Sequence, residues 1–369
     1  MKLTCDRQKL LETFLIAESI TPRKTSKPIL KNIKLDALKN QVRIMATNME
    51  LTMKRTIEVG SVGKEGTVLV AGKDMVDILR ETDSEDVFIS VADNNVTIKA
   101  GEDTFTIPAN IAEDFFSVED IKPDFEVTIT RVRLLEMIEQ TLFTTGKETM
   151  AYTFEGILVN VEPKNMEIVG TDGKRIAIAS SVCTNPSGRE KKALVPIPTL
   201  RTLQHSLGIS GDESITIKLC PNHIMFEDSR TQLVSQLIEG RFPEYRNYIP
   251  ADYGISGSFR KAELEKGIRK ADIMTSQETH LVKFGFSRET KSLTMTSRCL
   301  DRGTSEIRIP LLGYDGESVA VGYNGRHILD VLKVLREDKV TWRIKDDQGP
   351  GEIAEAGNFK YIFMPVKLR

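Results

Sequence analysis

Residue types that build metal and redox sites are scarce in this chain. Its 369 residues include only four cysteines and four histidines, all far apart. Cys5, Cys183, Cys220 and Cys299 form no Cys-x-x-Cys pair. Such a distribution excludes a disulfide framework and the common zinc sites. We therefore expect free thiols without a chemical role in a reducing compartment, no metal site and no bound cofactor.

Long apolar runs are missing as well. No stretch reaches about eighteen apolar residues, the length that a membrane-spanning helix needs. The opening segment Met1–Arg7 lacks the apolar core of a secretory signal. We therefore expect a cytoplasmic protein with no membrane partner. The net charge of −2 also excludes a bulk polycation, although a small total can hide faces of opposite charge.

Catalytic motifs are not recognisable either. Gly72–Asp74 follows an apolar run, as in a phosphate-binding loop, but Thr67 occupies the required glycine position and an aspartate replaces Ser or Thr. Asp172 beside Lys174 could be a catalytic carboxylate, but a turn between two strands is the better interpretation, because Asp favours turns. No nucleophile, base and orienting partner occur together. We predict that the chain is not an enzyme.

What the chain does contain is a pattern that recurs about every 125 residues. A short strand followed by an amphipathic helix is predicted at Lys2–Glu18, Glu126–Thr141 and Ser256–Ile273. A second strand–helix pattern follows each of these, starting near residues 68, 194 and 319. The sequence thus predicts an α+β fold of three similar domains, each a duplicated strand–helix–strands unit. We place the domains at residues 1–125, 126–252 and 253–369.

Five motifs keep their order along the whole length of the chain. They are Lys27–Asn32, Thr47–Leu51, Gly170–Ala177, Leu237–Tyr245 and Tyr361–Leu368. Together with the chain length and the repeat, these motifs resemble the bacterial sliding clamps, the β subunits of DNA polymerase III.

The resemblance implies a function in DNA replication. Clamps of this family are processivity factors without catalytic activity, and two copies form a six-domain ring as a head-to-tail homodimer around double-stranded DNA, without base-sequence specificity. A peptide-binding pocket tethers the partners to the ring. The implied partners are the DNA polymerase III α subunit, the clamp-loader complex, and other DNA polymerases and repair proteins with clamp-binding peptides.

Domain size is consistent with a ring of six domains but not of three. A domain of about 123 residues has a radius of gyration of roughly 14 Å, and hence a diameter of about 35 Å. Three touching spheres of that size leave a gap of only about 5 Å, and six leave about 35 Å. Duplex DNA is roughly 20 Å wide. One chain therefore cannot encircle DNA, whereas two can.

The resemblance also implies a peptide-binding pocket with apolar walls for leucine or phenylalanine anchors. Arg175, Asn324 and His327 are expected to hydrogen-bond the polar end of a motif that contains Gln-Leu. The pocket residues are Phe154, Thr171, Gly173, Lys174, Arg175, Ile176, Pro243, Asn247, Tyr248, Asn324, His327, Ile362, Phe363, Met364, Pro365, Val366 and Lys367.

Two further sets of residues follow from the same resemblance. Lys24, Lys73 and Arg80 match DNA-facing positions, and basic residues at the starts of the repeated helices, including Arg7, Arg131 and Lys261, are expected to attract phosphates as well. The dimer interface is expected to bring Phe105 and Ile107 of the first domain against Ile273 and Met274 of the third.

Two other functions remain open at this point. The chain could be a three-domain protein-binding adaptor that never meets DNA, or an enzyme that uses Asp172 and Lys174. A basic lining in one plane would favour the clamp. A closed cleft with perturbed carboxylates would favour the enzyme.

Overall fold

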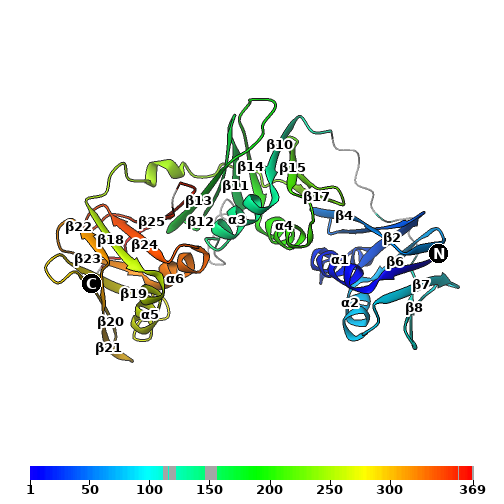
Figure 1. Cartoon of the computed structure of the whole chain (residues 1–369), viewed down its shortest axis with the longest axis horizontal. Helices are drawn as coiled ribbons and strands as arrows, with labels where there is room; N and C mark the ends of the chain where they lie inside the picture. The colour runs from blue at the N-terminus through cyan, green and yellow to red at the C-terminus, as the bar shows by residue number, and fades with distance from the viewer. Residues whose placement is uncertain (111–114, 116–121, 146–155, 356, 368–369) are drawn as a thin grey trace. The chain divides into compact units, whose positions relative to one another are not determined.

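The structure is a computed structural model, which describes residues 1–110, 115, 122–145, 156–355 and 357–367 (Figure 1). The first third contains β1 (Lys2–Asp6), α1 (Arg7–Ile20), η1 (Pro28–Lys31), β2 (Asn32–Leu38), β3 (Gln41–Thr47), β4 (Leu51–Glu58), β5 (Ser61–Lys64), β6 (Gly66–Ala71), α2 (Gly72–Glu81), β7 (Asp86–Ala92), β8 (Asn95–Ala100) and β9 (Asp103–Pro108). The middle third contains β10 (Phe125–Thr130), α3 (Arg131–Leu142), β11 (Gly156–Val161), β12 (Asn165–Thr171), β13 (Arg175–Val182), β14 (Lys191–Pro196), α4 (Ile197–Ile209), β15 (Ser214–Leu219), β16 (His223–Glu227), β17 (Thr231–Gln236) and η3 (Tyr245–Tyr248). The last third contains β18 (Ile255–Arg260), α5 (Lys261–Asp272), β19 (Leu281–Ser287), β20 (Ser292–Cys299), β21 (Gly303–Pro310), β22 (Gly313–Asp315), β23 (Val319–Asn324), α6 (Gly325–Val334), β24 (Lys339–Ile344), β25 (Gly351–Glu355) and β26 (Phe359–Phe363).

The element order confirms the strand–helix repeat. Each third begins with a strand that leads directly into a helix, and a second strand–helix pair follows after further strands. The predicted segments Lys2–Glu18, Glu126–Thr141 and Ser256–Ile273 end within two residues of the ends of α1, α3 and α5. Apolar periodicity is a local signal, so it survives without knowledge of the tertiary fold. No helix within the described ranges is long and apolar enough to cross a membrane.

The chain folds into two compact units, and each takes in segments from two of the predicted domains. Unit 1 comprises Met1–Leu135 and Cys183–Ile238, and unit 2 comprises Glu136–Val182 and Glu239–Arg369. The boundaries that we place after residues 125 and 252 stay a prediction.

Unit 1 contains a five-stranded sheet with the order β5-β1-β7-β8-β9 and an eight-stranded sheet with the order β10-β15-β16-β17-β4-β3-β2-β6. Antiparallel pairing of β17 with β4 joins strands from the first and middle thirds. Helix α1 packs against α2 and α4 (Figure 1). The apolar face of α1, with Leu10 and Phe14 fully buried, explains this position.

Unit 2 contains a sheet with the order β11-β12-β13-β26-β25-β24-β18-β22 and a four-stranded sheet with the order β21-β20-β19-β23. The only tryptophan of the chain, Trp342, lies fully buried at its centre. The ring of Trp342 lies 5.0 Å from Phe284 and 5.4 Å from Phe363, measured between ring centroids. This aromatic core ties the last strand of the chain to both sheets of the unit.

A basic residue at the start of the first helix in each third binds the end of the second helix. Each of these side chains is half-buried and donates to a carbonyl oxygen at or near the C-terminus of that helix, where the helix dipole is negative. These three side chains therefore have a role inside the fold, and the expectation that they attract phosphates stays a prediction. The hydrogen bonds are Arg7 Nη1 to Leu79 O (2.8 Å), Arg131 Nη1 to Leu207 O (2.9 Å) and Lys261 Nζ to Leu335 O (2.5 Å).

Candidate functional site

The turn between β12 and β13 forms one end of the candidate site. Asp172 Oδ1 accepts hydrogen bonds from the backbone N–H groups of Lys174 and Arg175, at 3.0 and 3.1 Å. Thr171 Oγ1 accepts from Gly173 N and donates to Arg175 O. Gly173 has a φ of 85°, which a residue without a Cβ adopts at little cost. The interpretation of Asp172 as a turn residue is therefore confirmed.

The guanidinium of Arg175 holds the turn against two other segments of unit 2. Nε donates to Asp172 and Nη1 to Asp330 of α6, both at 2.9 Å, and Nη2 donates to Phe143 O at 3.1 Å. Burial by itself lowers the pKa of Arg175, but Tyr361 and the two carboxylates outweigh it and raise this pKa above its ordinary value. Arg175 is thus only 8% exposed and organises the wall of the site. A contact of its guanidinium with a peptide stays a prediction.

The start of α6 forms a second wall. Asn324 Oδ1 caps the helix by accepting from the N–H groups of Arg326 (2.9 Å) and His327 (3.3 Å), so only its amide nitrogen is left for a ligand. Burial, with the nearby charge of Arg175, lowers the pKa of His327 to about 4. The imidazole is therefore neutral at pH 7. Tyr361, fully buried, donates its hydroxyl to His327 O at 2.8 Å.

The C-terminal tail crosses the site as an extended segment. Strand β26 pairs with β13, and Met364 N then donates to Lys174 O at 2.9 Å. Two residues later, Val366 N donates to Gly322 O of β23 at 2.8 Å. Ile362 and Phe363 are buried in the core, so they support the site from beneath, whereas Met364–Lys367 lie at its surface.

An apolar cluster lies beside this tail. Its buried members are Leu158, Val169, Ile176, Ile178, Tyr245 and Ile362, and its half-buried members are Phe242, Ile249 and Met364. Pro243 is half-buried, Asn247 is exposed and Tyr248 is 55% exposed. The structure thus brings the β12–β13 turn, the start of α6 and the tail together in unit 2. Pro243, Asn247 and Tyr248 flank Tyr245, the member of η3 that belongs to the cluster. Phe154 lies outside the described residues.

Comparison with known proteins identifies the family. Family models for the DNA polymerase III beta subunit match in order: the N-terminal domain at residues 1–119, the central domain at 128–244 and the C-terminal domain at 246–367. The chain belongs to the DNA polymerase III beta subunit family. It is a sliding clamp, a non-enzymatic processivity factor whose function implies DNA and polymerase partners.

Relatives match over the whole chain at low identity. The beta sliding clamp of Chlamydia muridarum is 25% identical over 370 residues, covering 100% of this chain and 99% of the relative. That of Caulobacter vibrioides is 25% identical over 379 residues, covering all of both chains. Solved beta subunits from Pseudomonas aeruginosa (23% identical, TM-score 0.91) and Thermotoga maritima (21%, 0.92) also cover all of both chains and share the fold.

The cations predicted to face DNA all lie in unit 1 and are exposed. Lys24 lies in the loop after α1, and Lys73 and Arg80 lie on α2. A spacing of seven residues places the latter two on one face of the helix, two turns apart.

The predicted interface residues lie on two different units. Phe105 and Ile107 are half-buried on β9, opposite the fully buried Ile98 and Val96 of β8. Ile273, directly after α5, is 60% exposed, and the neighbouring Met274 is half-buried.

Sequence reasoning missed several residues that shape this clamp's site. Asp330, Phe143 and Tyr361 hold Arg175, and Tyr245 and Phe242 build the apolar cluster. Position 330 could have been suspected, because it lies three residues after His327 on a predicted helix and so shares its face. The other residues lie on segments that are far apart in sequence and that only the tertiary fold brings together.

We predict that His327 makes unit 2 sensitive to acid. Its folded pKa of about 4 lies below the ordinary 6.5, so the unfolded chain binds the extra proton first as the pH falls. Stability is therefore lost between about pH 6.5 and 4, by roughly 2–3 kcal/mol. His327→Gln should remove most of that loss. Urea unfolding followed by Trp342 fluorescence, at several pH values in this range, measures it.

The exposed His205, in unit 1, provides the matched control. His205→Gln should leave the acid sensitivity of the Trp342 signal as in the parent chain. An equal acid sensitivity of the parent chain and His327→Gln would contradict the prediction.

Proposed function

We propose that two copies of this clamp close head to tail into a ring around double-stranded DNA. We further propose that the surface formed by the β12–β13 turn, Pro243–Tyr248, the start of α6 and Met364–Lys367, here called the peptide groove, binds short peptides of the DNA polymerase III α subunit, the clamp loader, and other polymerases and repair proteins. Three clamp domains in order, matched from residue 1 to 367, carry this proposal. We keep the domain boundaries after residues 125 and 252 as part of it.

Two open sheet edges support the closure of the ring. Strand β9 is the last strand of the five-stranded sheet of unit 1, and β21 is the last strand of the four-stranded sheet of unit 2. An open edge presents unpaired backbone groups to another chain. The exposed Ile273 lies beside the β20–β21 turn, since Arg302 Nη1 donates to Ile273 O at 3.4 Å. An apolar side chain next to an open edge suits contact with Phe105 and Ile107 of a second copy.

The composition of the groove supports peptide capture. The half-buried Met364 and Pro243 and the exposed Tyr248 offer apolar surface for leucine or phenylalanine anchors. Lys174 is exposed at the turn, and Asn324 keeps its amide nitrogen for a polar group. Solved clamps of P. aeruginosa and Bartonella birtlesii are bound to griselimycin. Because those clamps bind a ligand, we propose that this chain has a ligand site as well.

Retention on DNA tests the ring. The protein, loaded by a clamp loader, should stay on a closed circular duplex and be lost when the circle is cut once. Topology rather than affinity then holds the protein, so moderate salt should not release it from circles. A stable dimer that is never retained on circles would favour the protein-binding adaptor instead.

We predict that Lys24, Lys73 and Arg80 supply salt-dependent contacts to DNA. Changing all three to glutamine should reduce the slope of log K against log salt by up to about 2.7, since each phosphate contact contributes roughly 0.9. Fluorescence anisotropy of a labelled duplex over a salt series measures the slope.

A triple variant with the same change of charge serves as the control for this slope. Lys39, Lys64 and Lys99 are exposed on unit 1 but lie outside its helices. Their replacement by glutamine should leave the slope almost unchanged. Equal slopes for the two triple variants would refute the assignment.

A further inference from the structure

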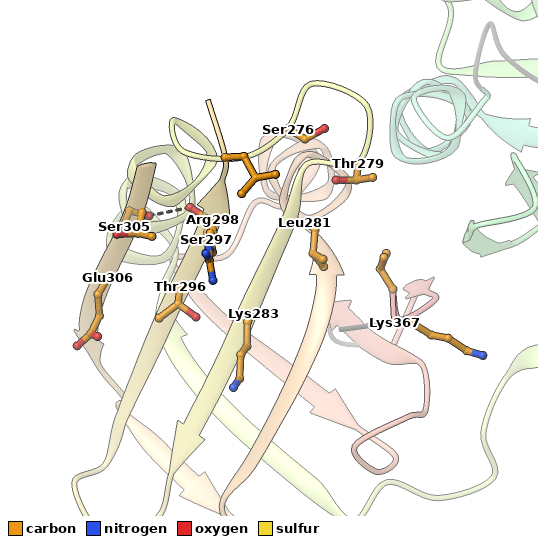
Figure 2. A pocket seen from close by; sticks show the side chains of 13 residues that line it. Ser276, Thr279, Leu281, Lys283, Thr296, Ser297, Arg298, Ser305, Glu306 and Lys367 are labelled. Atoms are coloured by element: carbon orange, nitrogen blue, oxygen red, sulfur yellow. Dashed lines mark hydrogen bonds between the residues drawn. The ribbon is translucent and has the colours of Figure 1, made fainter. Parts of the chain in front are cut away.

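Unit 2 has a concave surface that shares only Val366 and Lys367, at the end of the tail, with the proposed peptide groove. A cavity of about 1050 Å³ lies on the sheet formed by β19, β20 and β21. Figure 2 shows Lys283, Thr296 and Glu306 side by side on these strands, with Lys367 of the tail to one side. Ser276 and Thr279, in the segment that follows α5, lie at one end of the cavity.

Strand register explains why these side chains share one face. Lys283 pairs with Thr296, and Thr296 pairs with Glu306, so the three residues form one row across the sheet. Arg298 and Thr304 form another row. Side chains alternate between the two faces of a strand. The neighbours of Lys283 along β19 accordingly point into the core and are fully buried.

The cavity carries an excess of positive charge. Lys283, Arg298 and Lys367 are all exposed, and none of them has an ion-pair partner among the residues that the structure describes. The single carboxylate of the lining, Glu306, lies 3.9 Å from Arg308. The hydroxyl groups of Thr279, Thr296 and Thr304 add hydrogen-bond donors, whereas those of Ser297 and Ser305 are bonded within the fold. A concave surface with three free cations suits an anionic ligand.

The tail connects this cavity with the proposed peptide groove. Met364 packs against the apolar cluster of the groove, whereas Val366 lines the cavity. Two residues of extended chain span only about 7 Å. A peptide anchored in the groove therefore reaches the cavity by crossing the tail. Leu300, 91% exposed, lies in the lining and offers an apolar contact as well.

We propose that this cavity binds an acidic segment that flanks the apolar anchor residues of a partner peptide. The proposal rests on the proposed peptide groove and extends its specificity. The free cations face carboxylates of the flank, and the threonine hydroxyls of the lining donate to its backbone carbonyl groups. Partners that carry such a flank bind more tightly than partners with the same anchors alone, and the gain weakens with salt.

Two synthetic peptides test this proposal. Both carry a Gln-Leu core with leucine and phenylalanine anchors, and they differ only in having glutamate or glutamine flanks on both sides. We expect the glutamate-flanked peptide to bind the parent chain about 5-fold more tightly at low salt, the sum of two or three exposed ion pairs. In Lys283→Gln/Arg298→Gln the gain should fall below about 2-fold. Isothermal titration calorimetry measures both affinities.

The matched control changes two exposed lysines of unit 2 that do not line the cavity, Lys291→Gln and Lys339→Gln. This control variant should keep the full gain in affinity for the glutamate-flanked peptide. A full gain in Lys283→Gln/Arg298→Gln, or an equal loss in the control, overturns the proposal.

Three other outcomes also decide the matter. If the glutamine-flanked peptide does not bind the parent chain, the peptide groove itself fails, and the cavity proposal with it. If both peptides bind equally, only the cavity proposal fails. Lys283→Gln/Arg298→Gln could lose the affinity gain and, in addition, lose the dimer or the retention on circular DNA. In that case the cations bind a second copy or DNA, and the proposal is overturned.

Discussion

Replacing Ile273 and Met274 together by alanine should yield a folded monomer. Ile273 is 60% exposed and Met274 half-buried in the single chain, so their shortening costs the isolated unit little. At a closed interface they would lose about 3 kcal/mol of apolar burial. A ring of two chains has two such interfaces, which makes about 6 kcal/mol, or roughly 10⁴-fold in the dimer dissociation constant. Sedimentation velocity at micromolar concentration measures the change.

The control for this double variant removes nearly as much apolar side chain elsewhere on unit 2. Val182 and Leu312 are 80% and 50% exposed, and neither belongs to the predicted interface. Val182→Ala/Leu312→Ala should remain dimeric. The monomer must also keep the buried environment of Trp342, read from its fluorescence. A dimer that survives in Ile273→Ala/Met274→Ala would remove the basis for our head-to-tail arrangement.

Deleting Met364–Arg369 should abolish binding of the glutamine-flanked peptide while leaving the dimer intact. The deletion removes the half-buried Met364 from the edge of the apolar cluster, together with the tail segment that crosses to Gly322. Burial of one such side chain against a ligand is worth about 1.5–3 kcal/mol. With Pro365 and Val366 also gone, we expect a loss of at least about 100-fold, measured by calorimetry.

A chain that ends at Lys367 is the matched control for this deletion, because it keeps the contacts of the tail with Lys174 and Gly322. The longer deletion leaves Phe363 in place, so the pairing of β26 with β13 and the packing of Trp342 are retained. Full peptide affinity in the folded, dimeric deletion variant would show that the groove lies elsewhere.

Local chemistry made much of this fold predictable. The strand–helix repeat follows from apolar periodicity, which needs no information on tertiary contacts. The turn at Thr171–Arg175 follows from Asp and Gly at the positions that its hydrogen bonds and left-handed backbone require. These features depend on neighbours within a few residues, and the structure confirms them.

The roles of individual charged residues were harder to predict. The resemblance implies that Arg7 attracts DNA, and the structure shows that it also binds Leu79 O, 72 positions away. It implies that Arg175 binds a peptide, and the structure shows that it also binds Asp330, 155 positions away. A guanidinium is compatible with either role, and the choice depends on which acceptors the fold brings within reach.

By itself, the sequence determined the repeated elements, the family to which the chain belongs and the set of segments that make the candidate site. Only the tertiary structure decided which side chains of those segments are exposed and which hold the wall, and it alone revealed the cationic cavity beside the tail. The physical reason is that burial and long-range hydrogen bonds select among the chemical roles open to each residue. The half-buried His327 is neutral, and the buried Arg175 donates to Asp172, Asp330 and Phe143 O. Lys283 and Arg298, in contrast, stay exposed without a carboxylate partner among the described residues.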